Sequence, residues 1–551
     1  MPAGGKALKI QVREDSPRAC RRHWRAGIAL LGLILAAPLL ASDSISVATH
    51  AQRLQIAATD GGVVRWQVSA DGADIVLTSE FGNNVHSHHL QVIAGTSAAP
   101  PDVLTLDSDL STTAGSEILS RSIADDTGLR VTRRLQVPEE GFHLRMRLEF
   151  LNEGDAPVTV RGPVAGPAIR LGPGLGGQEI AYEGVAASLY DFLNAVLLRV
   201  DDSGATVLQL EEEQNELTGT QAVWAGLNNR YSLLAVGAPA DMPFTSVRLH
   251  RDTLAAEQLM ADERNVQHAS VLDLDLPVFT LAPGETRAMD FNVYAGAKDI
   301  SRLSRVEGFD LRAVMFADLW QWMRWLCFAL LWIMAAINGV IGNLGVTIIL
   351  LAVAIRLLLY PLGRAAAQQQ LRFNEKQAEL KPELERIKAG YTGGEQAERI
   401  FELYRRHGVS PAAGVKSLLV VLVQIPVFIA LFHILGQAIE FSGAPFLWID
   451  DLARPDHLFS LPFALPYFGS SFNLLPVLMA IVSIIAMGVN RAGDESRGQV
   501  VFLVAVNIGF FLIFYHFPAG MVLYWTVANL LHLLQHLLAS VRNRTGERVQ
   551  S

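Results

Sequence analysis

The chain shows two patterns of hydrophobic residues, and the change from one to the other comes near residue 298. From Ser42 to about Lys298, hydrophobic and polar residues alternate, as they do from Leu144 to Phe150, and Gly, Pro, Asn and Asp interrupt the runs. Alternation with a period of two places successive side chains on opposite faces of a strand. Long apolar stretches replace this pattern after Ala297. The sequence therefore predicts an all-β domain, a large sandwich, followed by a helical part embedded in a membrane.

Five apolar stretches in the second part are candidates for membrane-spanning helices. They run at about Asn343 to Leu362, Lys416 to Leu435, Asn473 to Asn490, Gln499 to Tyr515 and Gly520 to Val541. Several are shorter than the roughly 20 residues that a bilayer needs, so we expect the membrane to be thinned around them.

An aromatic-rich stretch, residues 316–341, precedes these spans and contains Arg324. Its composition favours a helix that lies in the outer membrane interface. A further spanning helix is the alternative, because the run from Trp325 to Ile341 is barely long enough to cross.

The distribution of basic residues predicts the orientation. Residues 1–25 are rich in Lys and Arg and precede an apolar run from Ala26 to Ala41, which is typical of a signal peptide or signal anchor, and the residues at the possible cleavage sites favour an anchor. Nine Lys and Arg residues lie between Arg364 and Arg406, whereas the loop from Glu440 to Phe472 carries only Arg454. Because cytoplasmic loops are enriched in Lys and Arg, we expect both termini and the basic loop in the cytoplasm.

The basic loop is also expected to form a helical hairpin. Two amphipathic helices, at about Ala365 to Ala389 and Glu395 to His407, are separated by a glycine-rich junction. Two oppositely charged pairs at i,i+4 spacing support the second helix: Glu395 with Arg399, and Glu402 with Arg406.

These observations divide the chain into twelve segments. The expected segments are, in order, a signal anchor or first membrane segment (1–41), a β-sandwich domain (42–300), a linker with the interfacial helix (301–342), a spanning helix (343–363), the cytoplasmic helical hairpin (364–414), a spanning helix (415–436), an outer loop (437–472), a spanning helix (473–490), a short inner loop (491–498), two further spanning helices (499–516 and 517–541) and a cytoplasmic tail (542–551).

Composition narrows the class of protein. With 50% hydrophobic and 18% charged residues, the 551-residue chain is too apolar for an ordinary soluble protein, and it has no basic, aromatic-studded patch for nucleic acid. Its two cysteines, Cys20 and Cys327, give no disulfide framework. His86, His88 and His89 lack a partner Cys or carboxylate at a ligand spacing, so we interpret them as a solvated loop. No nucleotide-binding loop or nucleophile motif occurs, so neither a metal, a cofactor nor an enzymatic activity is expected.

Arg356 lies inside an apolar span, where a charge costs about 2.5 to 3.5 kcal/mol. Snorkelling to the cytoplasmic surface would offset that cost. However, Gln424 and Asn507 are each expected about 12 Å deep, and Gln535 about 10 Å deep, from the number of residues to the cytoplasmic end of their spans. Four polar side chains from four spans are thus expected to face a common interior or a water-filled recess, with helix packing as the alternative.

The last span carries two further candidates. Trp525 and Asn529 are expected at its outer and middle levels, so Trp525 would close the outer end of the recess. A place in the aromatic belt of the membrane is the alternative for Trp525.

These residues resemble the motifs of the YidC, Oxa and Alb family of membrane insertases. Arg356 stands ahead of Tyr360-Pro361-Leu362, and the chain also carries Gln424-Ile425-Pro426-Val427-Phe428, Phe517-Pro518-Ala519-Gly520, Leu523-Tyr524-Trp525, and in the hairpin Leu380-Lys381-Pro382 and Leu403-Tyr404. The resemblance covers nearly the whole chain and is of the Gram-negative type with a large periplasmic domain; a specialised paralogue stays open.

The resemblance implies a fold and a function. The fold is a periplasmic all-β super-sandwich followed by an α-helical core of five spans, with a cytoplasmic helical hairpin. The function is that of an insertase and chaperone for new inner-membrane proteins, with a hydrophilic groove, open to the cytoplasm and to lipid, that Arg356, Gln424 and Trp525 line. Nascent membrane proteins and lipid are the implied partners; the Sec translocon with its accessory subunits, and the ribosome through a short tail, are weaker ones.

Two other functions remain as alternatives. A solute transporter could use Arg356 to bind an anion, but it predicts paired repeats or broken helices that the sequence does not show. A carbohydrate-binding or carbohydrate-modifying module on an anchor would require residues 42–298 to act alone.

Overall fold

The structure is a computed structural model that describes residues 44–48, 52–57, 63–70, 73–76, 91–94, 111–113, 117–124, 127–138, 143–162, 164, 166–173, 175, 193–201, 204–210, 216–239, 241–253, 256–257, 269–304, 311–407, 413–489 and 497–550. The chain forms two compact units, Met1–Ile180 with Leu193–Arg312 (the β unit) and Ala181–Phe192 with Ala313–Ser551 (the helical unit). The expected signal anchor and the three clustered histidines lie outside the described residues.

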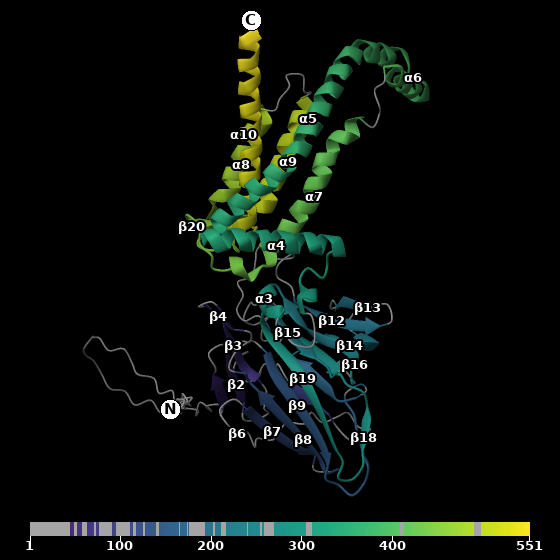
Figure 1. Ribbon diagram of the computed structural model, residues 1–551, viewed down its shortest axis with the longest axis vertical. Helices are drawn as coiled ribbons and strands as arrows, with labels where there is room; N and C mark the ends of the chain where they lie inside the picture. The colour runs from purple at the N-terminus through teal and green to yellow at the C-terminus, as the bar shows by residue number, and fades with distance from the viewer. Residues whose placement is uncertain are drawn as a thin grey trace, which may run out of the picture. The chain divides into compact units, whose positions relative to one another are not determined.

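The β unit consists of antiparallel strands (Figure 1). The strands are β1 (Ser44–Ala48), β2 (Gln52–Ala57), β3 (Val63–Ala70), β4 (Ala73–Val76), β5 (Gln91–Ile93), β6 (Ser111–Thr113), β7 (Glu117–Ala124), β8 (Leu129–Gln136), β9 (His143–Asn152), β10 (Val158–Val160), β11 (Ala168–Leu171), β12 (Leu193–Asp201), β13 (Gly204–Leu210), β14 (Glu216–Asn229), β15 (Ser232–Gly237), β16 (Phe244–Arg251), β17 (Ser270–Asp275), β18 (Phe279–Leu281) and β19 (Thr286–Ala297).

The described strands of this unit form three sheets. The large one has the order β5-β11-β17-β16-β14-β15-β19-β9-β8-β7-β6, with β12 joined to β14 and β13 joined to β12. The strands β1 to β4 form a second sheet in sequence order, and β10 pairs with β18. A short helix, α3 (Ile300–Leu303), follows, and Asp299 caps it by accepting a hydrogen bond from the Ser301 backbone N–H.

Strand β9 confirms the predicted alternation. Its residues Leu144, Met146, Leu148 and Phe150 are fully buried, and the residues between them are partly or fully exposed. All four belong to one large hydrophobic core in this unit. The sequence pattern therefore identified both the strand and the face that packs inward.

The helical unit contains seven longer helices and a small hairpin among its described residues. They are α4 (Gln321–Ile341), α5 (Leu344–Gly390), α6 (Gly393–Arg406), α7 (Ala413–Gln437), α8 (Leu474–Val489), α9 (Arg497–Phe514), α10 (Ala519–Gln550), the 3₁₀ turns η2 (Leu311–Val314, whose first two residues belong to the β unit) and η3 (Ile439–Phe441), and the strands β20 (His457–Leu465) and β21 (Gly469–Asn473).

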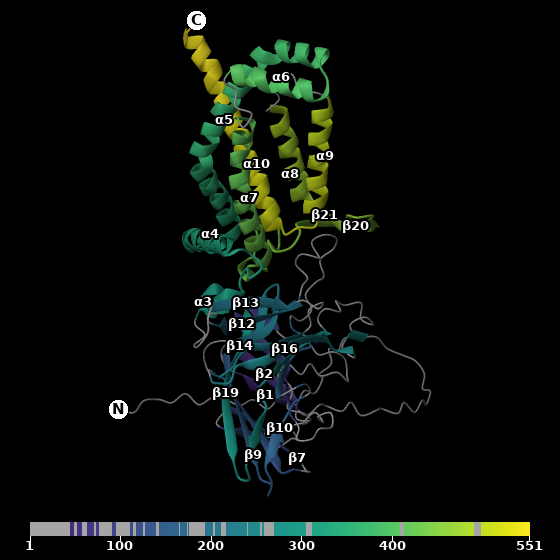
Figure 2. The same cartoon turned by 90° about the vertical axis from the view of Figure 1, so that its right-hand side faces the viewer.

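Helix α10 lies at the centre of the packing, because it contacts α5, α7 and α8, while α5 also packs on α7 and α8 on α9. Helix α4 runs across the end of this bundle, and Figure 2 shows it nearly end-on (Figures 1 and 2). Both α4 and the first 18 residues of α5 are long and apolar enough to cross a membrane. Whether α4 spans the membrane or lies in its interface stays a prediction.

The structure differs from the expected segments in four places. The span beginning at Asn343 and the first hairpin helix are one continuous helix, α5, which includes Pro361 and Pro382. The segment from Ala365 to Gln370 consists of good helix formers, so the helix continues beyond the expected boundary at residue 363. The expected interfacial helix begins at Gln321 instead of 316, because Phe316 adopts a left-handed φ of 57°.

The other two differences lie nearer the C-terminus. The expected outer loop contains the β20–β21 hairpin, whose strands the alternation rule could not find because β20 is exposed on both faces. The expected tail, residues 542–551, continues α10 to Gln550, since no proline interrupts it.

Candidate functional site

Arg356 is held between two helices of the bundle. It lies half-buried on α5, and its Nε donates a hydrogen bond of 2.9 Å to Oε1 of Gln535 on α10. The neighbouring Leu357 and Leu358 are exposed on the outer surface of α5. Arg356 therefore faces α10 and not the outer surface of α5.

A second group near Arg356 is the hydroxyl of Tyr524, also on α10. The guanidinium and the Tyr524 hydroxyl are close enough to interact electrostatically, and the Gln424 side chain on α7 lies within hydrogen-bonding reach of the same hydroxyl. Tyr524 is 3% exposed. Tyr524 and Gln535 are 11 residues apart, so the polar groups form a column about 16 Å long beside α10. We call Arg356, Gln424, Tyr524 and Gln535 the polar column.

The polar column carries an unbalanced positive charge. Among the described residues, no carboxylate interacts with Arg356, and its partners are a neutral amide and a neutral phenol. Such dipoles reduce the cost of burying the guanidinium without cancelling its charge. An anionic group that reached the column would therefore be attracted to Arg356.

Trp525 closes one end of the column with aromatic rings. Its ring centroid is 4.8 Å from that of Phe428 on α7, and 5.5 Å from those of Phe510 and Phe514 on α9. The edge-to-face packing on Phe428 is a favoured aromatic geometry. Trp525 thus packs among aromatic rings of α7 and α9, directly after Tyr524 of the column, and its place at the outer end of a recess stays a prediction.

Two predicted residues do not join the column. Asn529 donates from Nδ2 to Oγ of Ser483 on α8, at 2.8 Å, and so ties α10 to α8 as helix-packing contacts do. Asn507 on α9 is half-buried, and within the described part of the chain it makes no side-chain hydrogen bond. Tyr524 was predicted only as a motif residue, although a phenol next to Trp525 at that depth also indicates a place in the column.

The motif ahead of α10 has a positional role. The Ala519 and Gly520 backbone N–H groups donate to the carbonyls of Arg454 and Leu452, at 2.7 and 2.8 Å. A Cβ on Gly520 would lie 3.2 Å from the Leu452 oxygen, so the glycine permits this close approach. The Pro518–Gly520 segment therefore fixes the start of the helix that carries Tyr524, Trp525 and Gln535. The other motif residues, Tyr360, Pro361 and Pro426, lie within α5 and α7.

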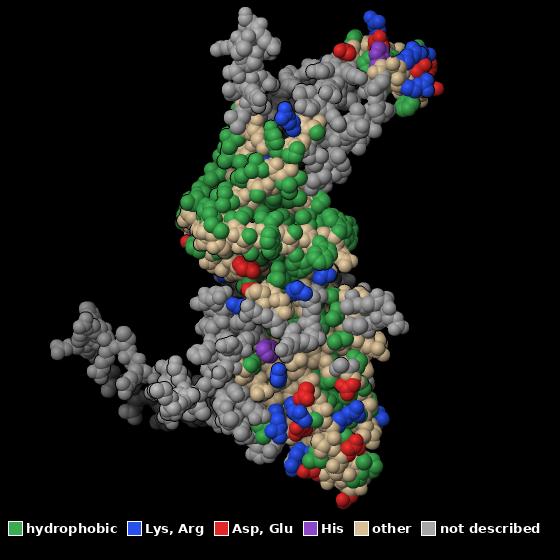
Figure 3. Space-filling view, in the orientation of Figure 1, with side chains coloured by type: hydrophobic (Ala, Val, Ile, Leu, Met, Phe, Trp, Pro, Cys, Tyr) green, Lys and Arg blue, Asp and Glu red, His purple; other side chains and the backbone are tan. Residues whose placement is uncertain are grey.

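The predicted helical hairpin is confirmed. Leu380 and Leu403 form its small core, and Leu384, Ile387 and Tyr404 pack against them. Both predicted ion pairs are present, with Arg399 3.3 Å from Glu395 and Arg406 2.7 Å from Glu402. In Figure 3 the charged side chains of the helical unit gather on α6, whereas hydrophobic side chains cover the visible face of α4 and the bundle.

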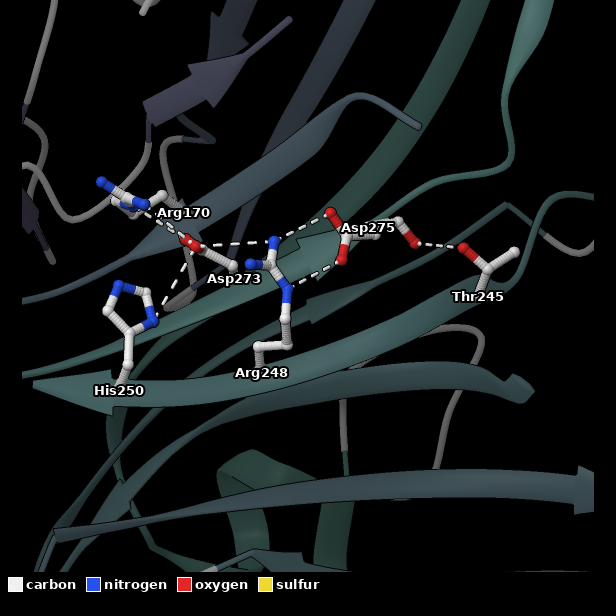
Figure 4. Close-up of polar contacts among 6 residues, drawn as sticks. All are labelled: Arg170, Thr245, Arg248, His250, Asp273 and Asp275. Carbon is white, nitrogen blue, oxygen red and sulfur yellow. Dashed lines mark hydrogen bonds and ion pairs between the residues drawn. The ribbon is translucent and has the colours of Figure 1, made fainter. Parts of the chain in front are cut away.

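The β unit contains a second polar cluster (Figure 4). Arg170 makes two hydrogen bonds to Asp273, at 2.7 and 2.9 Å, and Arg248 makes two to Asp275, both at 3.1 Å. Burial raises the pKa of Asp275 despite Arg248, and burial lowers the pKa of His250, which lies beside Asp273. Because the two arginines and two carboxylates balance, the cluster joins β11, β16 and β17 and leaves no net charge for a ligand.

Two family models match the chain in succession. The model described as the YidC periplasmic domain matches residues 64–333, and the model described as 60Kd inner membrane protein matches residues 336–545. Together they cover both units outside the N-terminal region.

Curated relatives carry the same family name. The membrane protein insertase YidC of Herminiimonas arsenicoxydans is 27% identical over 548 residues, which are 95% of this chain and 88% of the relative. The one of Janthinobacterium sp. (strain Marseille) is 31% identical over 317 residues, which are 57% of this chain and 51% of the relative.

Solved structures give weaker likenesses. A crystal structure of an active YidC insertase with its first transmembrane domain resolved is 16% identical, covers 89% of this chain and 91% of that one, and has a TM-score of 0.33. A galactose mutarotase-like protein from Lactobacillus casei matches 46% of this chain and 100% of its own, with 11% identity and a TM-score of 0.31.

The two family models correspond to the two units of the structure. The β unit corresponds to the periplasmic domain and the helices to the inner-membrane part, and the relatives are named as insertases, not enzymes. The chain is thus a bacterial inner-membrane protein with a periplasmic domain, and it belongs to the YidC family of membrane protein insertases.

Proposed function

We propose that the helical unit inserts newly made membrane proteins into the inner membrane and assists their folding, with the polar column as the transient site for their polar segments. The observation that carries this proposal is the half-buried position of Arg356, which has no carboxylate partner among the described residues. A charge held in this way costs stability, so a function in attracting an anionic segment gives a reason for its presence.

The column would lower the barrier for a polar tail in the membrane. Gln424, Tyr524 and Gln535 offer hydrogen bonds that lipid cannot give, and Arg356 attracts acidic side chains. Because the column offers a single charge beside neutral hydrogen-bonding groups, the tail could leave again. The membrane potential would then favour outward movement of each acidic charge by about 2.3 kcal/mol per 100 mV.

The apolar segment of a client would enter lipid between α5 and α7. These two helices pack on each other and both contact α4, which lies across their ends. A client helix of roughly 20 apolar residues gains free energy by partition into the bilayer, so no nucleotide is required. In this scheme α5 and α7 part while α4 holds their outer ends.

Topology and partners extend the proposal. The basic hairpin of α5 and α6 would face the cytoplasm, with five spans and both termini inside. The same hairpin, with its exposed Arg405 and Arg406, is a candidate contact for the ribosome, and the β unit is a candidate contact for the Sec translocon.

A depletion-rescue experiment tests the proposal. Cells depleted of their own insertase would express this chain, Arg356→Ala or Arg364→Ala, and integration of a small two-span client would be measured. Arg364 is the matched control, because it is an exposed arginine on the same helix. We expect the wild-type chain and Arg364→Ala to restore client integration. With Arg356→Ala, client integration should be at least tenfold lower than with the wild-type chain.

Two outcomes would contradict the proposal. If the wild-type chain is abundant in the membrane but restores nothing, a general insertase function is wrong. If Arg356→Ala restores integration fully, the column is not the client site. Arg356-dependent uptake of an anionic solute in place of rescue would favour the transporter alternative.

A further inference from the structure

The β20–β21 hairpin exposes hydrophobic side chains on both faces. Eight of the nine residues of β20 are exposed, and Phe463 keeps 60% of its surface free. A four-residue bulge from Leu461 to Ala464 separates the paired positions, and Phe463 lies in it. An apolar edge strand in water is an aggregation hazard that proteins usually block with charged residues.

The sequence of the hairpin supplies no Asp, Glu, Lys or Arg that could block its edge. The sequence contains no Asp, Glu, Lys or Arg from Leu458 to Val489, a stretch that includes all of α8. A binding surface for another protein would normally carry a polar rim and charged residues at its edge. A surface without charge is expected instead where the partner is the apolar part of a lipid.

Hydrogen bonds attach the β20–β21 hairpin to the end of α9 and to the start of α8. Tyr467 lies in the turn between β20 and β21, and its hydroxyl donates a hydrogen bond of 2.6 Å to the Leu512 carbonyl in the last turn of α9. Asn473, at its end, donates from Nδ2 to the Tyr515 carbonyl at 2.7 Å, and α8 begins at the next residue. These contacts fix the hairpin beside the ends of α8 and α9, which is where a membrane interface would lie.

Helix α4 lies at the same end of the bundle as the hairpin (Figures 1 and 2). It buries Met323, Cys327, Leu330 and Met334 against the bundle. Four tryptophans are exposed: Trp320, which precedes the helix as its N-cap, and Trp322, Trp325 and Trp332 within it. Tryptophan and tyrosine are enriched at membrane interfaces, since their rings are apolar and their N–H or O–H groups are polar. The aromatic residues of α4 and of the hairpin thus mark one level.

We propose that the β20–β21 hairpin inserts into the headgroup and acyl-chain boundary of the outer leaflet, and that lipid is the partner that covers it. Helix α4 contacts α5 and α7, whereas the hairpin is attached to α8 and α9. The two elements would therefore anchor opposite sides of the bundle at one depth, roughly 5 to 10 Å below the membrane surface. This anchoring would keep the short α8 and α9 in register with the bilayer while α5 and α7 separate.

Spin labels on the full chain in liposomes test the proposal. A nitroxide would be attached at Phe463→Cys in a Cys20→Ser, Cys327→Ala background that still rescues depleted cells, and its accessibility to oxygen and to a water-soluble nickel chelate would be compared. The matched controls are Ile481→Cys, which is exposed on α8, and Asp290→Cys, which is exposed on the β unit.

We expect the label at residue 463 to favour oxygen as at residue 481, with several-fold lower nickel accessibility than at residue 290. A label as accessible to nickel as the one at residue 290 would show that the hairpin lies in water and would overturn the proposal. A label accessible to neither reagent would show that protein covers the hairpin, and that outcome would overturn it as well.

Discussion

At the scale of single residues, the charge of the polar column decides what it can attract. Among the described residues, Arg356 interacts with neutral groups, and its Nε donates a hydrogen bond to Oε1 of Gln535, 2.9 Å away. A carboxylate at residue 535 would form an ion pair with Arg356 at that distance and cancel its charge. The charge of the column can thus be changed while its shape is preserved.

The variant Gln535→Glu is therefore expected to impair insertion of clients with acidic tails. Integration of such a client should fall about tenfold, which corresponds to about 1.4 kcal/mol, while the same client with a neutral tail should change little. The measurement is protease protection of each client in depleted cells that express the variant.

The control for this variant is Asn507→Asp, which adds a carboxylate at a similar expected depth on α9, outside the column. It should not discriminate between the two tails. An equal loss for both tails in Gln535→Glu would mean that the residue supports the fold of the bundle and not the recognition of charge.

A second residue-scale prediction concerns the polar cluster of the β unit. Asp275 is fully buried and accepts two hydrogen bonds from Arg248. Removing one partner of a buried pair leaves the other charge uncompensated, so Asp275→Ala should lower the free energy of unfolding of this unit by about 3 to 5 kcal/mol. Pulse proteolysis of the full chain in nanodiscs, over a urea series, measures that change.

An exposed pair on the same unit provides the comparison. Asp290 lies 3.4 Å from Arg147 with 72% of its side chain exposed, so Asp290→Ala should cost less than about 1 kcal/mol. Equal effects of the two substitutions would contradict a buried structural role for the cluster.

At the scale of elements, the helical hairpin depends on a very small core. Leu403 on α6 is 7% exposed and packs with Leu380 of α5, whereas Phe401, two residues away, is 56% exposed. Leu403→Ala should destabilise the docking of α6 by about 2 kcal/mol, because it removes a buried side chain. Phe401→Ala removes a larger side chain but should have little effect.

Hydrogen exchange of the amides in α6 measures this difference. We expect exchange in Leu403→Ala to be faster by roughly one to two orders of magnitude, and exchange in Phe401→Ala to stay near the wild-type rate. Faster exchange in both variants would mean that α6 is not held by the Leu380–Leu403 contact.

Elements with a clear period were predictable from the sequence, and elements without one were not. Hydrophobic and polar residues alternate in strand β9, and the helical hairpin carries charged pairs four residues apart, so the sequence predicted both elements. The β20–β21 hairpin is apolar on both faces, which removes the period-two signal. The sequence did not predict that the first clear span continues into the helical hairpin as one helix, because Pro361 suggests a break. Helix α5 accommodates this proline.

At the scale of the whole molecule, the expected depth of each residue was not enough to predict which residues form the polar column. Counting residues from the helix ends placed Arg356, Gln424, Asn507 and Gln535 at similar depths. It could not say which way each side chain points, because that depends on how the helices pack. The packing of α10 on α5 and α7 brings three of the four together, whereas Asn507 on α9 makes no hydrogen bond to a described residue.

The division into two units leads to the last prediction. The large hydrophobic core belongs to the β unit alone, and every residue of the polar column, of the aromatic closure around Trp525 and of the helical hairpin belongs to the helical unit. A chain that lacks residues 44–312 thus retains all the groups to which we assign client binding. We expect it to restore at least half of the client integration that the full chain restores in depleted cells.

The same deletion combined with Arg356→Ala is the decisive comparison, because it should lose the activity that the deletion keeps. Membrane levels of both proteins must match, which an epitope tag at the C-terminus allows. If the deleted chain is present at normal levels but inactive, the β unit contributes to insertion itself. The polar column would then be necessary for the reaction without being sufficient, and client recognition would have to involve the periplasmic domain.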